Sequence, residues 1–397
     1  MAGFRTLDHA DVKGQRVLVR ADLNVPSENG VVTDPTRIER MAPSITELAD
    51  KGAKVILISH FGRPKGRNAK DSLKPVAAEL AHTLKRPVKF VDDCVGEVAE
   101  RAVAEMKPGD FLCLENTRFH PGEEKNDPVF AAQLAKLGDI YVNDAFSVSH
   151  RAHASTEGIA HVLPAFAGRT LQAELEAFAQ VLDDPQRPVA AIVGGAKIST
   201  KLDLLGNLLP RVDALIIGGA MANTFLMALG KNVGRSLVER DLVDTAQKIM
   251  DEAKRAKREF VLPVDAVVAD KLEAGVSTRV VDVDHVDEND MILDIGPRSI
   301  EFVCSVLARM KTLMWNGPFG AFEVEPFDTG TVEVAEAVGE LTAAGKLVSV
   351  AGGGDTVAAL NIAGVTDRLT YVSTAGGAFL EWLEGKPLPG VEVLRIK

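Results

Sequence analysis

The chain has 397 residues, which is more than one ordinary domain and suits two. Its 45 Lys and Arg residues against 56 Asp and Glu residues give a formal net charge of -11, which excludes the overall basic character of a nucleic-acid-binding protein. Hydrophobic residues make up 46% of the chain, as in globular proteins. The three cysteines are scattered without a C-x-x-C pair, which is typical of free thiols in a reducing compartment.

Short apolar runs recur along the first half of the chain. The predicted strands are 16–20, 54–59, 88–91, 111–115 and 140–144. Each run is almost continuously apolar, as in a strand that is covered on both faces. Segments with helical spacing lie between them, and one of these ends at Gly52.

A single helix is predicted between the two halves, over residues 170–184. Leu171, Leu175, Phe178 and Leu182 recur at the spacing of one helical face, and the pattern ends at Asp-Asp-Pro. We interpret this helix as the connection between two lobes.

The second half repeats the alternation of strands and helices. Its predicted strands are 189–194, 214–218, 260–268, 291–296, 312–315 and 347–352. A helix is predicted from Ser236, which forms a capping-box pattern with Glu239. The longest uncharged stretch, 214–230, is interpreted as strand, glycine turn and helix rather than a membrane span.

These patterns predict an α/β fold of two Rossmann-like lobes, each a parallel sheet flanked by helices, joined by an interdomain helix. The predicted boundaries are 1–169 for the N-terminal domain, 170–184 for the hinge helix and 185–372 for the C-terminal domain. In open parallel sheets, ligands bind at the carboxyl ends of the strands. The residues that follow each strand are therefore the candidates for function.

In the first half, the strand ends carry arginine and histidine. Arg63, Arg118 and Arg151 each follow a different strand, with His60 and His150 nearby. Arginines that converge in one cleft would repel each other unless an anion neutralised them, and their guanidinium groups suit carboxylate or phosphate. The predicted ligand is a small, hydroxylated anion.

Three further residues belong to this predicted anion site. Arg37 follows the first strand, and Asp22 with Asn24 would hold a hydroxyl or carbonyl group. An alternative for the "HRAH" segment is a metal site at His150 and His153, but a structural zinc site needs four ligands.

In the second half, the strand ends are rich in glycine. "GGGDT" (352–356) lies between a strand and a helix, where backbone N–H groups and the helix dipole favour phosphate. Asp355 would hold Mg²⁺, which binds oxygen ligands and substrate phosphates, and Thr356 could assist. The glycines of "GGAM" (218–221) and "NGPFG" (316–320) suit a flat adenine slot, and Glu323 could accept ribose hydroxyls.

Two lysines follow the first strand of this half, in "GGAKISTK" (194–201). The order of residues differs from the Walker pattern G-x-x-x-x-G-K-[ST], so this loop is not expected to wrap around phosphates. Lys197 and Lys201 are four residues apart, and we expect them to share one helical face and to approach a phosphate chain from the side.

Eight motifs, in order, resemble the phosphoglycerate kinase family. They are "VRADLNVP" (19–26), "SHFGRP" (59–64), "LENTRF" (114–119), "NDAFSVSHRAHAS" (143–155), "GGAKISTK", "WNGPFGAFE" (315–323), "GGGDT" and "STAGGAFLE" (373–381). The resemblance implies reversible phosphoryl transfer from 1,3-bisphosphoglycerate to Mg-ADP, giving 3-phosphoglycerate and ATP. It also implies a monomer whose C-terminal segment, 373–397, returns to the N-terminal domain.

The resemblance assigns roles to individual residues. Those implied to bind the glycerate ligand are Asp22, Leu23, Asn24, Arg37, His60, Phe61, Gly62, Arg63, Arg118 and Arg151. Those implied to bind the nucleotide are Lys201, Gly219, Glu323, Gly353, Gly354, Asp355 and Thr356, with Asp355 on Mg²⁺. Arg37, Lys197 and Gly376 are implied to be catalytic.

The chain departs from the family pattern at two places. The family's "TGGGA" is "TAGGA" here, with Ala375 in place of glycine. Because alanine is disfavoured at positive φ, we expect an ordinary backbone at Ala375 and place the useful amide at Gly376. The family's "RVDFNVP" is "RADLNVP", an apolar change.

Other functions are weighed against the kinase. A nicotinamide dehydrogenase would carry G-x-G-x-x-G, which is absent. A two-lobed anion- or nucleotide-binding protein without kinase chemistry would normally carry an export signal, and the N-terminus has no apolar h-region. A glycosyltransferase has only the lobe count in its favour. We therefore expect a cytoplasmic enzyme of small-molecule substrates, without nucleic-acid or membrane partners.

Overall fold

The computed structural model describes residues 3–396, and the chain forms two compact units. Unit 1 comprises the residues up to Glu176 together with those from Pro387 onward, and unit 2 is Ala177–Lys386. The division falls inside the predicted hinge helix. This helix has α geometry over α5 (Arg169–Phe178) and continues as a π-helix over Ala179–Asp183.

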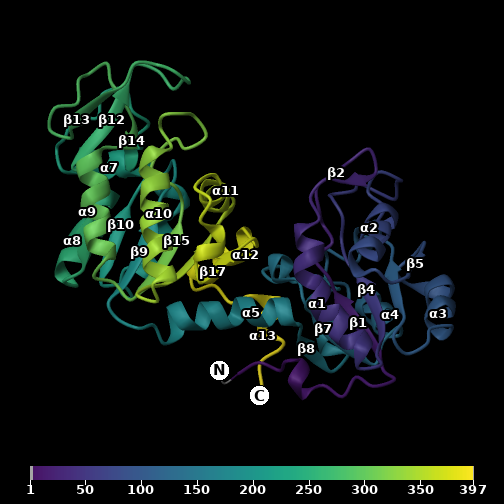
Figure 1. The fold of residues 1–397 in the computed structure, drawn as a ribbon. Coiled ribbons are helices and arrows are strands. Elements are labelled where there is room, and N and C mark those ends of the chain that lie inside the picture. The colour runs from purple at the N-terminus through teal and green to yellow at the C-terminus, as the bar shows by residue number, and fades with distance from the viewer. Residues whose placement is uncertain (1–2, 397) are drawn as a thin grey trace. The chain divides into compact units, whose positions relative to one another are not determined.

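Unit 1 is built on a six-stranded sheet in which every strand pairs in parallel with its neighbours (Figure 1). In sheet order the strands are β5 (Val88–Val91), β6 (Phe111–Leu114), β4 (Lys54–Ile58), β1 (Arg16–Arg20), β7 (Ile140–Asn143) and β8 (Ala165–Ala167). The five strands predicted for this half are confirmed. The edge strand β8 was not predicted, because three residues carry too little pattern to identify a strand.

Helices flank this sheet, and their apolar faces form its core. They are α1 (Thr36–Asp50), α2 (Lys74–Leu84), α3 (Gly96–Ala104) and α4 (Pro128–Ala135), with a two-residue hairpin of β2 (Ser27–Glu28) and β3 (Val31–Val32) before α1. Ile38, Met41, Ile45 and Leu48 place one face of α1 in the core, and Gly52 has φ +83° just beyond the helix, as predicted.

Segments near the two ends of the described chain pair with each other in unit 1 (Figure 1). Phe4 pairs with Arg395 in an antiparallel bridge, and the Asn143 side chain donates to the Gly390 carbonyl over 2.9 Å. The short helix α13 (Pro389–Glu392) belongs to this returning segment. The return begins at Pro387 instead of the predicted 373.

Asp144 anchors the start of α5. Its carboxylate accepts hydrogen bonds from the backbone N–H groups of Thr170 and Leu171, at 2.8 and 3.1 Å, and from the Thr170 hydroxyl. Burial raises the pKa of Asp144 to about 7, although these hydrogen bonds oppose the shift.

Asp144→Asn is expected to change how stability depends on pH. A carboxyl group whose pKa is raised on folding stabilises the fold fully below its unfolded pKa, and this contribution is lost as pH rises towards the folded value. The free energy of unfolding of the variant, relative to wild type, should therefore increase between pH 4 and pH 7, by about 1–4 kcal/mol. Urea denaturation across this range measures it.

Asp139→Asn is the control for this measurement. The hydrogen bond from Arg16 lowers the pKa of Asp139, so its contribution to stability is lost as pH falls. Between pH 4 and pH 7 the stability of Asp139→Asn relative to wild type should stay nearly constant, because this contribution is lost only below the ordinary aspartate pKa of about 4, whereas that of Asp144→Asn should change. A difference for Asp144→Asn that does not vary with pH would contradict the raised pKa.

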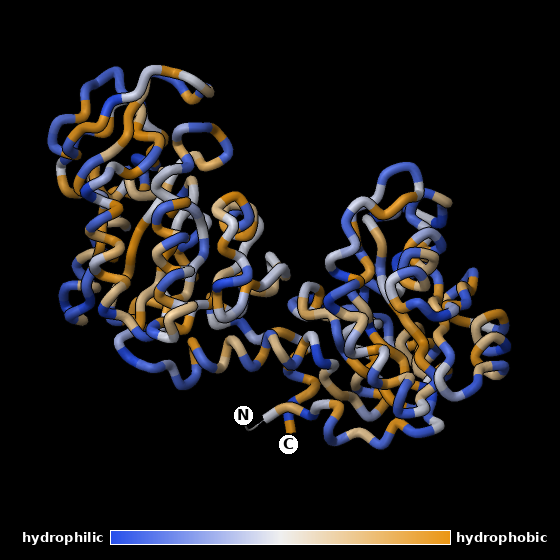
Figure 2. Tube along the Cα trace, viewed as in Figure 1, coloured by the Kyte–Doolittle hydropathy of each residue, from blue (hydrophilic) through white to orange (hydrophobic). Residues whose placement is uncertain are grey.

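Unit 2 contains a second six-stranded parallel sheet (Figure 1). In sheet order the strands are β11 (Glu259–Val261), β10 (Ala214–Ile217), β9 (Val189–Val193), β15 (Thr312–Asn316), β16 (Val348–Gly352) and β17 (Tyr371–Ser373). The helices of the unit are α6 (Leu202–Leu208), α7 (Met221–Ala228), α8 (Val243–Arg255), α9 (Pro297–Leu307), α10 (Thr329–Ala343), α11 (Gly354–Ile362) and α12 (Gly377–Leu383). The central strands are apolar along most of their length (Figure 2).

Two strands predicted for the parallel sheet belong to a separate antiparallel sheet instead. It contains β13 (Arg279–Asp282), β12 (Asp265–Ala269) and β14 (Met291–Ile295). The predicted strand 260–268 is broken in two, into β11 and β12, around Pro263. An apolar run has the same pattern in either direction, so the sequence did not show that β12 and β14 are antiparallel.

The predicted helix start at Ser236 is also wrong, because α8 begins at Val243. The Ser236 hydroxyl accepts a hydrogen bond from the Ile292 backbone N–H over 2.8 Å, and the Glu239 carboxylate accepts from Ser199. Both side chains of the supposed capping box therefore connect segments that are distant in sequence.

Helix α12 keeps residues 373–386 in unit 2. Phe379 is buried, lies 5.4 Å from Phe178 between ring centroids, and would contact any side chain added at Gly352. Asn207 donates to the Leu383 carbonyl over 2.6 Å. Across the described residues, no helix combines the length and hydropathy needed to cross a bilayer.

Candidate functional site

The carboxyl ends of β1, β4 and the loop after β7 bring a cluster of cationic side chains together in unit 1. At its centre is Arg20, the last residue of β1, which is only 1% exposed. Arg20 donates to Ser155 over 2.9 Å and to the Ala21 carbonyl over 2.7 Å. Arg20 was not predicted as a site residue. An arginine as the last residue of an apolar strand could have indicated it, because ligands bind at the carboxyl ends of parallel strands.

Arg20 also fixes the state of His60. Its Nη2 lies 3.0 Å from His60 Nδ1, and because arginine can only donate, Nδ1 accepts and the imidazole proton is on Nε2. Burial lowers the pKa of His60 well below its usual value, and the charges of Arg20, Arg118 and Arg151 add to the effect. His60 is therefore a neutral hydrogen-bond donor beside several positive charges.

Arg118 has the most unused hydrogen-bonding capacity of the arginines in this cluster. Its Nη1 donates to the Gly62 carbonyl over 2.6 Å, but buried Nε and Nη2 have no hydrogen-bond partner. Burial lowers the pKa of Arg118; Glu124, 3.4 Å from Nε, opposes this, and Arg151 and Arg20 add to it. Buried unpaired guanidinium groups are costly, so an anionic ligand would relieve this arrangement.

Asp22 and Asn24 lie beside Arg37. Arg37 donates to Asp22 Oδ1 and to the Asn24 carbonyl, both at 3.2 Å, and Ser147 donates to the other Asp22 oxygen over 2.8 Å. The Asn24 side chain accepts from the Gly62 backbone N–H over 2.9 Å. The first-strand loop and the 60–62 turn are thus joined by direct hydrogen bonds.

The neighbouring backbone of this site is held by buried polar groups. The Leu23 N–H donates to Ser59 Oγ and the Phe61 N–H to Asn116 Oδ1, both over 3.2 Å. Gly62 has φ +60°, and an added Cβ would lie 2.7 Å from Asp71. Leu23, Phe61 and Gly62 therefore shape the site through their backbone.

The remaining predicted residues of the anion site differ in burial. Arg63 is exposed, whereas Arg151 is half-buried and donates to His150 Nε2 over 3.2 Å. Burial, with Arg118 and Arg151, lowers the pKa of His153 to about 4. Among the described residues, His150 and His153 are not part of any three-ligand group, so the alternative metal site in "HRAH" finds no support.

Unit 2 contains a cavity of about 420 Å³ at the carboxyl ends of its strands. Its lining includes the predicted residues Gly219, Glu323 and Asp355, together with apolar side chains of the antiparallel sheet such as Ala266 and Ile292. Small-molecule sites have this size, and they are mostly apolar with a few polar groups. The sequence analysis missed the contribution of β12 and β14, because it assigned both strands to the other sheet.

Three glycine loops pack backbone to backbone at the mouth of this cavity. A Cβ at Gly219 (φ +69°) would lie 2.5 Å from the Gly195 carbonyl oxygen, and one at Gly317 would lie 2.2 Å from that of Gly194. No side chain fits at these positions, so the loops present backbone to the cavity.

Asn316 connects Lys201, which follows β9, to Gly352, which precedes α11. Lys201 Nζ donates to Asn316 Oδ1, and Asn316 Nδ2 donates to the Gly352 carbonyl over 2.8 Å. Thr356 is buried and accepts from the Gly317 N–H over 2.7 Å, so it braces the loops, and its predicted place on Mg²⁺ stays a prediction. Asn316 was not selected from the sequence, although it lies in "WNGPFGAFE".

Gly353→Ala is expected to disturb this arrangement. Gly353 has φ +99°, and an added Cβ would lie 2.5 Å from Asn316 Nδ2. The substitution combines unfavourable backbone geometry with displacement of Asn316, which holds Lys201. We expect KM for ADP to rise by about tenfold or more, equivalent to 1.4 kcal/mol, in steady-state kinetics.

Gly364→Ala is the control, since Gly364 has φ +66° but nothing within 4 Å of the added Cβ. It should lower the melting temperature with KM for ADP unchanged. Equal effects of the two substitutions on KM would show that the contact with Asn316 is unimportant.

Lys197 and Lys201 do not share a helical face, which corrects the prediction. Lys197 is extended (φ -140°, ψ 132°) before a 3₁₀ turn at Ile198–Thr200, and Lys201 lies between this turn and α6. Lys197 is exposed, and its ammonium group makes no hydrogen bond or ion pair within residues 3–396. Burial lowers the pKa of Lys201, opposed by Glu384 and Asp355. The two lysines therefore lie in different surroundings.

Asp355 is exposed in the first turn of α11, whereas Gly353 and Gly354 form the helix start. Gly376 has φ +48° at the start of α12, and Ala375 is not among the residues with positive φ, as expected for alanine. Glu323 is exposed on the loop after β15.

Comparison with known proteins gives consistent results. The family model described as "Phosphoglycerate kinase" matches residues 7–386. Proteins named phosphoglycerate kinase from Rhodopseudomonas palustris and Chelativorans sp. are both 64% identical, over 394 and 397 residues, covering 99% and 100% of each chain. The solved phosphoglycerate kinase structures from Coxiella burnetii and Pyrococcus horikoshii have TM-scores of 0.92 and 0.82 at 41% and 30% identity, each covering 98% of both chains.

Proposed function

The chain belongs to the phosphoglycerate kinase family, and on this basis we propose which ligand each of its two units binds. The enzyme transfers a phosphoryl group reversibly from 1,3-bisphosphoglycerate to ADP, which gives 3-phosphoglycerate and ATP in glycolysis. Unit 1 binds the glycerate ligand and unit 2 binds the nucleotide.

Two buried N–H groups of Arg118 carry the first assignment. Its buried Nε and Nη2 lack hydrogen-bond partners, and Arg20, Arg151 and neutral His60 surround it. A phosphate or carboxylate would accept from these donors and cancel their mutual repulsion. Asp22 and Asn24, held by Ser147 and the Gly62 N–H, would orient the glycerate hydroxyl group.

The cavity of unit 2 supports the second assignment. The glycine loops leave room for a flat base against apolar side chains, and Glu323 lies on the lining, where it can accept ribose hydroxyls. The N–H groups at the start of α11 and the Lys201 ammonium provide donors for the phosphate chain.

Asp355 fits the requirements for Mg²⁺. It is an exposed carboxylate on the cavity lining, and Mg²⁺ in such sites is held by one or two carboxylates and by substrate phosphates. When bound, the ion neutralises charge on the nucleotide phosphates. Further carboxylate side chains are not required, because the nucleotide phosphates and water supply the other ligands of the ion.

Lys197, Arg37 and the Gly376 amide are proposed to stabilise the transferring phosphoryl group. The transition state spreads negative charge over equatorial oxygens, so positioned cations and N–H donors provide most of the catalysis. The acceptor oxygen is already anionic in either direction, so no general base is needed.

Because the two ligands bind on different units, we propose that the reaction requires the units to close on each other. The change from α to π geometry after Phe178 coincides with the boundary between the units, and such local π turns often occur at functional positions. Closure would exclude water, which otherwise hydrolyses the acyl phosphate.

Calorimetric titration with Mg-ADP and then 3-phosphoglycerate tests these assignments, together with a coupled assay of ATP consumption. We expect each ligand to bind, and in the coupled assay we expect Mg-ATP to be consumed only when 3-phosphoglycerate is present. Binding without turnover would favour an anion- or nucleotide-binding protein without kinase chemistry. We further propose that the enzyme acts as a cytoplasmic monomer without nucleic-acid or membrane partners.

A further inference from the structure

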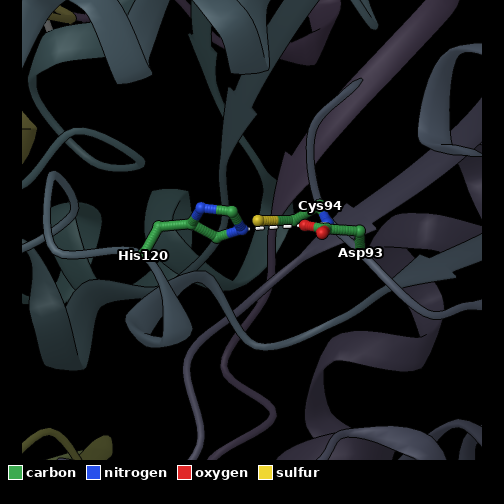
Figure 3. Close-up of side chains that lie close together, drawn as sticks. All are labelled: Asp93, Cys94 and His120. Atoms are coloured by element: carbon green, nitrogen blue, oxygen red, sulfur yellow. Dashed lines mark hydrogen bonds and ion pairs between the residues drawn. The ribbon is translucent and has the colours of Figure 1, made fainter. Parts of the chain in front are cut away.

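A group of three potential metal ligands lies in unit 1, outside the residues assigned to the reaction. Asp93 and Cys94 follow β5, and His120 follows the 3₁₀ turn Thr117–Phe119 after β6. β5 and β6 are neighbours in the parallel sheet, so their carboxyl ends bring the two loops together. The carboxylate, thiol and imidazole donor atoms all lie within 4.8 Å of one another (Figure 3).

We propose that Asp93, Cys94 and His120 form a binding site for Zn²⁺ or a similar divalent transition metal. Sulfur, imidazole nitrogen and carboxylate oxygen are the ligand types that zinc uses. A set containing a thiol is poorly suited to Mg²⁺ or Ca²⁺, which take oxygen ligands.

The geometry of the cluster favours this assignment. His120 Nε2 already lies 2.7 Å from Asp93 Oδ1, and Cys94 is fully buried with its sulfur directed at the same point (Figure 3). Bonds of about 2.3 Å to sulfur and about 2.0 Å to nitrogen and oxygen would require His120 Nε2 and Asp93 Oδ1 to move apart from hydrogen-bond distance, with the ion between them and the sulfur. His120 and Asp93 are half-buried, so solvent can supply a fourth ligand.

Neighbouring residues hold the proposed ligands in place. His120 stacks on Phe130, with ring centroids 5.0 Å apart. The second Asp93 oxygen lies 3.6 Å from Arg67, and Oδ1 accepts from the Cys94 backbone N–H over 2.7 Å, so both oxygens of the carboxylate are oriented. A metal at Oδ1 would take the place of the hydrogen bond with His120 Nε2. Supporting contacts of this kind orient the ligands in metal sites.

The charges of the site also balance. Burial raises the pKa of the Cys94 thiol well above its usual value, and nearby Asp93 adds to the shift. A bound Zn²⁺ would displace the thiol proton to solvent, and the thiolate and carboxylate would together neutralise the ion. The positive ion would thus stabilise the thiolate form of Cys94, which burial and Asp93 disfavour when no metal is bound.

Titration of the tag-free full-length protein with Zn²⁺ in excess Mg²⁺ tests the proposal, since Mg²⁺ occupies sites made only of oxygen. Calorimetry should show one Zn²⁺ per chain. His120→Ala and Cys94→Ser should each weaken binding by about 100-fold or more, because loss of even an outer-sphere partner costs 10–100-fold. Co²⁺ in place of Zn²⁺ should give a sulfur-to-metal charge-transfer band that disappears in Cys94→Ser.

Two matched controls should leave binding unchanged. His161→Ala removes a histidine that, like His120, is hydrogen-bonded to a carboxylate, in this case that of Glu157. Cys113→Ser changes a cysteine that, like Cys94, is free and buried. If His120→Ala folds normally and retains full Zn²⁺ affinity, or if the Co²⁺ complex lacks the sulfur band, the proposal is wrong and the cluster serves only to tie the two loops together.

Discussion

Replacing Lys197 with alanine is expected to lower kcat by about 10²–10³-fold and to leave the affinity for ADP nearly unchanged. The expected loss is that of removing one preorganised donor to the transition-state charge. Lys197 is exposed, extended and unpaired within the described chain, so its ammonium group is free to follow the transferring phosphoryl group. Steady-state kinetics and ADP calorimetry together measure the two quantities.

Lys201→Ala provides the contrast for this experiment. Lys201 is half-buried and held by Asn316, next to the proposed phosphate site, so its loss should mainly raise KM for the nucleotide. If Lys197→Ala lost ADP affinity to the same extent as kcat/KM, Lys197 would be a binding residue only, and the proposed role in the transition state would be wrong.

The second large effect is expected at Arg118. Arg118→Ala should raise KM for 3-phosphoglycerate by about 10²-fold or more, because two charge-assisted hydrogen bonds of about 1.5–3 kcal/mol each are lost. KM for ATP should not change, since the proposed nucleotide site lies in unit 2. The stability of the fold should change little, because the lost hydrogen bond to Gly62 and ion pair with Glu124 are offset by removal of a buried cation that Arg20 and Arg151 repel.

Arg63→Ala is the matched comparison, since Arg63 is an exposed member of the same predicted set. It should also weaken 3-phosphoglycerate binding, but by less than about tenfold, as for exposed ion pairs. Unchanged KM for 3-phosphoglycerate in Arg63→Ala would remove Arg63 from the site. An equally small effect for Arg118→Ala would mean that its unpaired N–H groups do not face the ligand.

The sequence was sufficient to identify much of the fold and the family. Strands buried on both faces must be apolar throughout, so the β1, β4 and β9 segments were recognisable without any contact information. Because ligands bind at the carboxyl ends of parallel strands, the arginines and the glycine loops could then be predicted to form two separate sites. The ordered motifs pointed to the family that the comparisons confirmed.

Several features depended on contacts between distant segments, and these were missed or misread. Ser236 and Glu239 matched a capping box but bind Ile292 and Ser199. Lys197 and Lys201 had helical spacing, yet a 3₁₀ turn separates them. A local pattern describes the structure that a segment can form alone. A distant segment changes this structure when it offers the same side chains other hydrogen-bond partners.

The sequence by itself determined which segments are buried and which residue types gather at the ends of the parallel strands. Burial follows from hydrophobic patterning, and strand direction follows from the right-handed crossover only where a helix connects two parallel strands. Only the tertiary structure decided that β12 and β14 form an antiparallel wall of the cavity, and that Arg20 sets the tautomer of His60. It alone brought Asp93 and Cys94 to His120. These features depend on distances between residues far apart in the chain, which no local pattern encodes.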